Sequence, residues 1–397
     1  MLSARTAWNL SANALAARLE EARAAGRRLL DLTESNPTRA GLSWPPERLK
    51  SALAQSAVAG YDPEPRGSPG ARRAVARYLS ESRGTQVDPG RILLTASTSE
   101  AYGLLLKLLC DPGDDVLVPA PAYPLLDVLA GLEAVALRRY PLRYDGSWHL
   151  DAAALARAVG PRSRAVLAVS PANPVGAVLA RAELEALEAL CAERGLALIV
   201  DEVFADTAPA DSVSALAARH CLAFHLSGLS KVCGLPQLKV GWLAAAGPEA
   251  LVGPALARLE VAADAYLSVS GPSQLALESL LPERELFLAP LRRRLSVNRS
   301  ALAAAAVGAS FTPLRGQGGW SAVLRVGETL DEEAVCLDLL DEGVVVQPGF
   351  FFDFERSGYL VVSLLTPPAD FTQGIGRLAR RLCADHASAR EIPSPHG

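Results

Sequence analysis

The sequence lacks paired cysteines of the kind that bind zinc or form a disulfide framework. Its six cysteines are scattered along the chain, and none belongs to a C-x-x-C pair. Scattered cysteines are typical of reduced thiols in the cytosol, so we predict a cytoplasmic protein without a metal site.

Long apolar runs and dense basic runs are absent too. No stretch approaches about 18 consecutive apolar residues, so a membrane-spanning helix is not expected. Residues 1–28 contain no continuous apolar block before a small-residue cleavage site; they predict an amphipathic helix capped near Ser11 and disfavour export. The net charge of −4, without a basic cluster, disfavours nucleic acid and acidic membrane surfaces as partners and favours a small-molecule role.

What the chain has is length and apolar content. With 397 residues, of which 50% are hydrophobic and 21% charged, it exceeds the usual size of one core and predicts at least two packed units. Short β-rich runs alternate with helical segments, which predicts an α/β fold with a mainly parallel sheet covered by helices. The expected strands are residues 92–96, 115–120, 164–170, 196–202, 222–227 and 240–246, and the clearest helices are residues 99–110 and 181–195.

The pattern changes after residue 284. A long helix is followed by short strands, a helix near residues 331–342 and a last helix near residues 368–384. This order predicts a smaller α+β domain at the C-terminal end.

Two lysines stand in the mostly apolar stretch "HLSGLSKVCGLPQLKVGW", residues 225–242. A buried lysine is costly unless an anion meets it or its amine is consumed in a covalent bond. Lys231 and Lys239 therefore raise the question of a ligand.

Further polar residues follow the ends of expected strands, where an α/β sheet places its ligand site. Residues 97–99 open a helix and could hold an anion with backbone N–H groups and hydroxyls, although serine and threonine are also ordinary helix caps. Asn173 stands in a turn with proline and glycine, which is an ordinary turn composition as well. Asp201 ends an apolar strand, where a carboxylate can equally be a cap or a solvated strand end.

Together these residues form an ordered series of an anion cradle, an amide, a carboxylate and two lysines. The series resembles the class I/II, fold-type I family of pyridoxal 5'-phosphate (PLP) aminotransferases, whose motifs run N-P-x-G, D-E-x-Y and S-x-S-K, with a cation eight residues after the lysine. The resemblance extends from "LTESNP" (32–37) to "GYLVVS" (358–363).

The resemblance implies an aspartate-aminotransferase-like fold and a homodimer with shared active sites. A large PLP-binding domain, residues 46–285, would hold a mainly parallel sheet of the seven-stranded type. Residues 286–397 would form the small α+β domain, and residues 1–45 an N-terminal arm and part of that small domain.

The resemblance also implies the central catalytic roles. Lys231 would form a Schiff base with the cofactor aldehyde and, once released, move a proton between the substrate α-carbon and the cofactor. Asp201 would keep the pyridine nitrogen protonated, so that the ring accepts electrons. Asn173 would donate to the phenolic oxygen of the ring. Tyr123 would stack on the ring face, although a half-buried core aromatic is the alternative for this residue.

The phosphate contacts implied by the family lie on either side of the lysine. Lys239 stands where the family usually has arginine, and a lysine offers a point charge without a bidentate fork. Tyr61 matches a tyrosine that reaches the phosphate of the neighbouring subunit's cofactor, although it could instead anchor its Pro-rich loop. The further cofactor contacts expected are Ser97, Thr98, Ser99 and Ser230.

Two further positions depart from the family pattern. Phe204 stands where the family has a tyrosine that bonds the phenolic oxygen, so one cofactor contact is changed. Val361 occupies the position of the arginine that clamps the substrate α-carboxylate. The candidate replacements for substrate binding are Ser35, Asn36, Asn173, Trp320 and Arg356, and the sequence does not choose among them.

The favoured function is a PLP-dependent aminotransferase that transfers an amino group between an amine or amino acid donor and a keto acid. A PLP-dependent lyase, decarboxylase or synthase is the alternative, because one scaffold supports several reactions and the arginine is absent. A non-catalytic PLP-binding module is a third interpretation, and the presence of Lys231 and Asp201 disfavours it.

Overall fold

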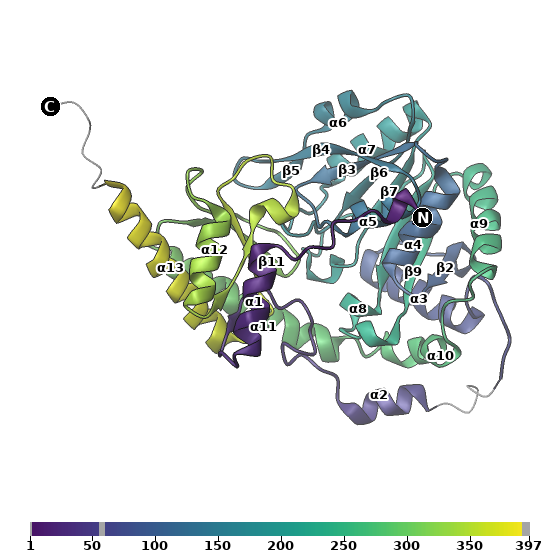
Figure 1. Ribbon diagram of the computed structural model, residues 1–397. Coiled ribbons are helices and arrows are strands. Elements are labelled where there is room, and N and C mark those ends of the chain that lie inside the picture. Colours follow the sequence, from purple (N-terminus) through teal and green to yellow (C-terminus); the bar gives the residue numbers. More distant parts are fainter. Residues whose placement is uncertain (1, 55–59, 391–397) are drawn as a thin grey trace.

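The computed structural model of the protein describes residues 2–54 and 60–390, with side chains up to residue 383. Its largest element is an eight-stranded sheet (Figure 1). In their order across the sheet the strands are β2 (Ile92–Thr95), β9 (Gly241–Ala246), β8 (Ala223–Gly228), β7 (Ala197–Asp201), β6 (Ser163–Val169), β3 (Asp115–Ala120), β4 (Ala136–Tyr144) and β5 (Trp148–Leu150). The five strands from β8 to β4 are parallel, β9 is antiparallel to β2 and β8, and β5 is antiparallel to β4. This confirms the predicted α/β class.

The six expected strands are confirmed to within one residue at each end. The sequence prediction missed β4 and β5, and the three-residue β5 extends the edge of the sheet beyond the expected seven strands. The β4 sequence ALRRYPLRY has only Tyr140 buried, because most of its side chains reach the surface near the sheet edge. A strand of this kind carries arginines and a proline instead of a continuous apolar run, so the signal used for the inner strands is missing.

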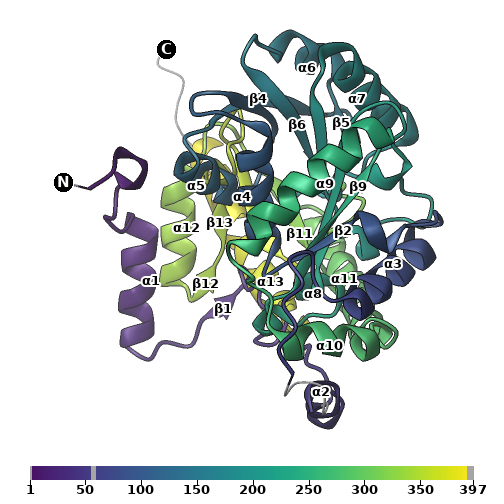
Figure 2. The same ribbon diagram turned by 90° about the vertical axis from the view of Figure 1, so that its right-hand side faces the viewer.

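Helices cover both faces of the sheet (Figures 1 and 2). Successive residues of a strand point to opposite faces, so Ile199 of β7 packs with one helix layer while Leu198 and Val200 pack with the other. The first layer contains α4 (Thr98–Leu109), α5 (Leu125–Leu132) and α9 (Glu249–Asp264). The second contains α6 (Ala152–Ala158) and α7 (Arg181–Arg194), with α3 (Pro69–Arg83) and α10 (Gly271–Leu280) near β2 and β9.

A second, antiparallel sheet lies beside the first. Its order is β10 (Thr312–Pro313), β11 (Ser321–Arg325), β14 (Tyr359–Ser363) and β13 (Gln347–Pro348). Its helices are α11 (Glu285–Ala306), α12 (Glu332–Asp341) and α13 (Pro368–Arg390), and β1 (Leu30–Asp31) pairs with β12 (Val344–Val345) in parallel. The mixture of helices and short strands agrees with the α+β prediction for the C-terminal part, while the boundaries at residues 45 and 285 remain predictions.

The N-terminal helix differs from the sequence expectation. Helix α1 covers Ala14–Ala24 and lies beside α12 (Figure 2). Its cap is Asn13, whose Oδ1 accepts from the N–H of Ala16 at 2.7 Å, so the expected cap near Ser11 is wrong by two residues. Helix α2 covers Pro46–Leu53. Within the residues that the structure describes, no helix is long and apolar enough to cross a membrane.

Candidate active site

A cavity of about 380 Å³ lies at the carboxyl ends of the parallel strands β3, β6, β7 and β8. This is the place where open α/β sheets hold their ligands. It brings together most of the residues expected from the sequence: Ser35, Ser97, Thr98, Ser99, Tyr123, Asn173, Asp201, Phe204, Ser230, Lys231, Lys239 and Trp320.

Lys231 lies on the short helix α8 (Leu229–Val232), which follows β8 directly. Burial lowers the pKa of its amine, and the nearby carboxylate of Asp201 acts in the opposite direction. The amine nitrogen lies 4.9 Å from the ring centre of Trp320 and 5.9 Å from that of Phe204. An amine with a lowered pKa is neutral, and so able to act as a nucleophile or base, in a larger fraction at neutral pH than an exposed lysine.

The N-terminus of α4 forms a cradle for an anion. The hydroxyl of Ser97 accepts from the N–H of Glu100 at 3.2 Å, so Ser97 is a helix cap as well as a cavity residue. The first-turn residues Thr98 and Ser99 open the helix, whose positive end faces the cavity that Lys239 also lines.

The backbone of β9 lies close against this helix end. A Cβ atom on Gly241 would lie 2.9 Å from the backbone carbon of Ser97 and 3.1 Å from the nitrogen of Thr98. A Cβ atom on Gly228, in the neighbouring strand β8, would lie 2.9 Å from the carbonyl oxygen of Val240 and 3.0 Å from the Cα atom of Gly241. These glycines let β8 and β9 approach the cradle without displacing it.

Asp201 ends β7 at the floor of the cavity and is 8% exposed. Its Oδ2 accepts from the hydroxyl of Tyr102 at 2.7 Å, and its Oδ1 accepts from the N–H of Val203 at 3.0 Å. Burial raises the pKa of Asp201, while these two hydrogen bonds and the charges of His225 and Lys231 act in the opposite direction.

The adjacent Glu202 points away from the cavity. Its Oε1 accepts from the hydroxyl of Ser214 and from the N–H of Ala215, both at 2.8 Å, and His225 Nδ1 lies 3.1 Å away. Burial alone would raise the pKa of Glu202, but His225 and Arg83 bring it below its ordinary value. The two neighbouring carboxylates therefore differ in role, since only Asp201 lines the cavity.

Aromatic and amide groups also line the cavity. The rings of Phe204 and Trp320 meet edge to face with centres 4.9 Å apart, and both side chains are buried. Asn173 Oδ1 accepts from the hydroxyl of Ser321 at 3.3 Å, so its amide NH₂ group points the other way. Tyr123 is 53% exposed at the rim, which fits a ring face open to a ligand better than a core aromatic.

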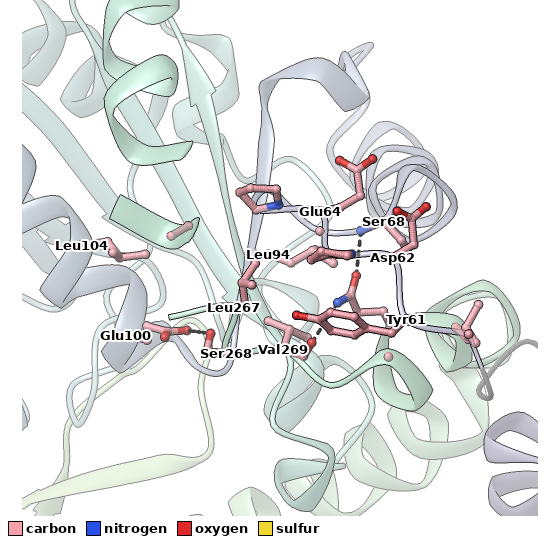
Figure 3. Close-up of a pocket in the computed structure, with 18 residues that line it drawn as sticks. Tyr61, Asp62, Glu64, Ser68, Leu94, Glu100, Leu104, Leu267, Ser268 and Val269 are labelled. Atoms are coloured by element: carbon pink, nitrogen blue, oxygen red, sulfur yellow. Dashed lines mark hydrogen bonds between the residues drawn. The ribbon is translucent and has the colours of Figure 1, made fainter. Parts of the chain in front are cut away.

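Tyr61 lies outside this cavity. Its side chain is 83% exposed and lines a separate pocket of about 210 Å³, together with Leu94, Leu267 and Val269 (Figure 3). Within one chain, the structure therefore does not bring Tyr61 to Lys231.

The candidate substrate anchors fall into two groups. Ser35, Asn173 and Trp320 line the cavity. Val361 is buried in an apolar cluster with Trp148, Val323 and Phe352, away from the cavity lining. A valine side chain suits this position because it packs against the apolar side chains of that cluster.

Asn36 and Arg356 are not among the residues that line the cavity. The side-chain oxygen of Asn36 accepts from the N–H and the hydroxyl of Thr38, at 3.1 Å and 2.7 Å. The side chain of Arg356 is 74% exposed and lies 3.7 Å from Glu328. The suggestion that Arg356 took over the duty of an arginine at position 361 finds no support in this arrangement.

Among the cavity residues that the sequence reasoning missed, Tyr102 and Arg139 carry polar groups. Tyr102 stands one helical turn after Thr98 on α4, and this spacing was the available signal, because residues four apart share a helix face. Arg139 lies on the unpredicted strand β4, where its Nη2 contacts Asp127 at 2.7 Å and Asp353 at 2.6 Å. The described cations that line the cavity are therefore Lys231, Lys239 and Arg139.

Comparisons with known proteins agree with this geometry. The profile of the family "Aminotransferase class I and II" matches residues 27–378. The chain is 30% identical over 394 residues to an arginine–pyruvate transaminase of Pseudomonas aeruginosa, covering 95% of this chain and 94% of the relative. It is 34% identical over 275 residues to a probable N-succinyldiaminopimelate aminotransferase of Mycobacterium tuberculosis, covering 66% of each chain.

Solved structures show the same fold. An alanine aminotransferase from Pyrococcus furiosus superposes with a TM-score of 0.88 at 22% identity, covering 97% of this chain and all of the other. An aspartate aminotransferase mutant of Thermus thermophilus superposes with a TM-score of 0.84 at 26% identity, covering 96% and 99%. The fold is thus aspartate-aminotransferase-like, as expected, and the chain is an aminotransferase that belongs to the class I and II family.

Proposed function

We propose that this aminotransferase binds pyridoxal 5'-phosphate in the cavity at the strand ends and holds it covalently through Lys231. The observation that carries the proposal is that a partly buried lysine, Lys231, and a buried carboxylate, Asp201, line one cavity with a helix N-terminus and a second lysine. When bound, the cofactor supplies an electrophilic aldehyde and an electron-withdrawing ring.

Each of these groups suits one part of the cofactor. Thr98, Ser99 and the first turn of α4 would hold the phosphate, with Lys239 supplying the positive charge. Asp201 would hold the proton on the ring nitrogen. The NH₂ group of Asn173 would donate to the phenolic oxygen without help from residue 204, because phenylalanine has no hydroxyl.

Lys231 would have two duties in the reaction. Its amine would form the covalent link, and the same amine, once free, would move a proton at the substrate α-carbon. Burial favours the neutral amine because it disfavours the ammonium form, and a base must be neutral to accept a proton.

The donor site is the part that departs from the family pattern. Position 361 offers an apolar side chain inside an apolar cluster, and the wall next to Lys231 consists of Phe204 and Trp320. We propose donors and acceptors that are held mainly through an apolar body, with Asn173, Ser35 or Trp320 as the weaker contacts for any carboxylate. The relatives named for arginine, pyruvate and N-succinyldiaminopimelate give the class of reaction.

Covalent labelling tests the cofactor proposal directly. The chain has four lysines, at positions 50, 107, 231 and 239, so borohydride reduction followed by peptide mapping gives an unambiguous answer. We expect the label on Lys231, none after Lys231→Ala, and unchanged labelling after Lys107→Ala, which removes an exposed lysine. A label that survives Lys231→Ala would refute the assignment.

We also propose a homodimer in which Tyr61 reaches the cavity of the neighbouring copy. Its support is the exposed ring of Tyr61 in a pocket that Leu94, Leu267 and Val269 also line (Figure 3). Leu267 is 38% exposed, and Tyr266, the residue before it, is 60% exposed. A monomeric mass with cofactor bound would contradict it. Each shared site would take Lys231 from one subunit and Tyr61 from the other. Mixed dimers of Tyr61→Phe and Lys231→Ala subunits should therefore contain one intact site and one site that carries both changes.

The cytoplasmic location remains a prediction. All six cysteines lie in the described part of the chain and are free, which fits a reducing compartment. Fractionation of the native host, with the protein found in the soluble cytoplasmic fraction, is the expected result.

A further inference from the structure

We propose that Tyr102 is a positioning residue for Asp201. Its hydroxyl would hold the carboxylate in one orientation and in its ionised form, so that Asp201 can face the ring nitrogen of the cofactor. The inference rests on the proposed cofactor site and adds to it a residue that lies on another element, α4.

The geometry gives each carboxylate oxygen its own donor. Tyr102 donates to Oδ2 of Asp201 at 2.7 Å, and the N–H of Val203 donates to Oδ1 at 3.0 Å. Both side chains are 8% exposed, and both line the cavity. A carboxylate with a donor on each oxygen cannot rotate freely, and each oxygen keeps a second lone pair for another donor.

The position of the tyrosine is fixed by packing. Helix α4 lies on the sheet through Leu104 and Leu105, which are buried in the core shared with α9 and the strands. Tyr102 precedes them on the same helix, so its ring enters the cavity from a rigid element. Rigid support of this kind is what holds a functional group in one geometry.

The chemistry favours a neutral donor at this place. Burial raises the pKa of Tyr102 well above its ordinary value, so the hydroxyl keeps its proton and can only donate to the carboxylate. Burial also raises the pKa of Asp201, and the hydrogen bond from Tyr102 opposes that effect. The other groups that face Asp201 are His225 on β8, Lys231 on α8 and the N–H of Val203.

A purely structural role makes a different prediction. If the hydroxyl of Tyr102 needed only a hydrogen-bond partner in the core, its removal would change the stability of the protein. It would then change the affinity for all cofactor analogues equally. A positioning role instead concerns the ring nitrogen, so it should disappear when that nitrogen is replaced by carbon.

The test compares two ligands on two variants. Apoprotein is titrated with pyridoxal 5'-phosphate and with the analogue in which a carbon replaces the ring nitrogen, and affinity is read from protein fluorescence. For Tyr102→Phe we expect a loss of roughly 10- to 100-fold for the first ligand and little change for the second, as for a lost hydrogen bond to a charged group.

Tyr140→Phe is the matched control. Tyr140 is also a buried tyrosine whose hydroxyl is bonded, in this case to the carbonyl oxygen of Leu167 at 2.8 Å, but it does not line the cavity. It should change thermal stability without changing the ratio of the two affinities. If Tyr102→Phe did not fold, Tyr102→Met would serve in its place with the same expected ratio.

The outcomes separate this inference from the proposed function. Equal losses for both ligands, or no loss for either, would overturn the role of Tyr102. Asp201→Asn should reduce affinity for the natural ligand and spare the analogue. If it does so while Tyr102→Phe leaves the ratio unchanged, the cofactor site stands and the positioning role falls. If the unmodified protein binds neither ligand, the proposed function itself fails.

Discussion

The surroundings of Val361 predict weak discrimination between amino acids and the amines that lack their carboxylate. A guanidinium–carboxylate pair in a closed site contributes a charge-assisted contact, and loss of one partner of such a pair costs about 2–5 kcal/mol. That corresponds to tens to thousands of times in affinity. A neutral donor such as Asn173 gives only about 1 kcal/mol, so it recovers less than tenfold.

The assay is the spectral half-reaction of the bound cofactor with matched donors. Alanine with ethylamine, and phenylalanine with phenethylamine, form two pairs that differ in the carboxylate alone. We expect rate constants within about tenfold of each other in each pair. The reverse half-reaction with pyruvate and acetaldehyde should show the same weak preference.

Two variants decide between this reasoning and relocation of the arginine to position 356. Arg356→Ala should not change the ratio of the two rate constants in either donor pair, because the side chain of Arg356 is 74% exposed and lies beside Glu328. Val361→Arg should fail to create a preference and should destabilise the fold by about 3–5 kcal/mol, the cost of an unpaired buried charge. A thousandfold preference for the amino acids that Arg356→Ala abolishes would refute the reasoning.

Two further predictions concern the cradle and the acid stability of the fold. Gly241→Ala should weaken binding of pyridoxal 5'-phosphate more than tenfold, because the added Cβ would lie 2.9 Å from the backbone at the start of α4. Binding of pyridoxal, which has no phosphate, should be less affected. Gly131→Ala is the control, because a Cβ atom at that position would meet open space. The pKa of Asp114 is about 2 instead of 3.8, chiefly because Arg164 donates to it, so its stabilising effect is present above pH 4 and is lost as the pH falls towards 2. Asp114→Asn should therefore be less stable than the parent at neutral pH, with the difference shrinking between pH 4 and 2, while Asp211→Asn at an exposed site should show no such trend in unfolding titrations.

The sequence predicted much of the cavity because a parallel sheet imposes its geometry. Asn173, Asp201 and Lys231 follow three neighbouring strands, and the carboxyl ends of such strands meet at one edge. The apolar strands themselves were recognisable because both of their faces are buried. Side chains that follow these strands could therefore be placed together without knowledge of their contacts.

Other features could not be predicted in this way. Tyr102 lies inside a helix, where an aromatic residue is an ordinary core residue, and only its hydrogen bond to Asp201 marks it. Arg139 lies on β4, whose alternating surface residues gave no strand signal. For Tyr61 the single chain is insufficient in principle, since its expected contact belongs to a second copy.

The two departures from the family pattern have one physical consequence in common. Phe204 and Val361 each replace a polar family residue with an apolar one, and both pack against further apolar side chains, Trp320 in one case and Phe352 in the other. Asp201 and Lys231, to which we assign the cofactor contacts, match the family pattern. The wall beside Lys231, formed by Phe204 and Trp320, is therefore more apolar than the family pattern implies. Burial of about 100 Å² of donor surface against such a wall contributes about 2.5 kcal/mol, which is comparable with the carboxylate contact that is missing. Affinity can thus be restored by a donor with an apolar body, and among amines without a carboxylate the rate should rise with the size of that body.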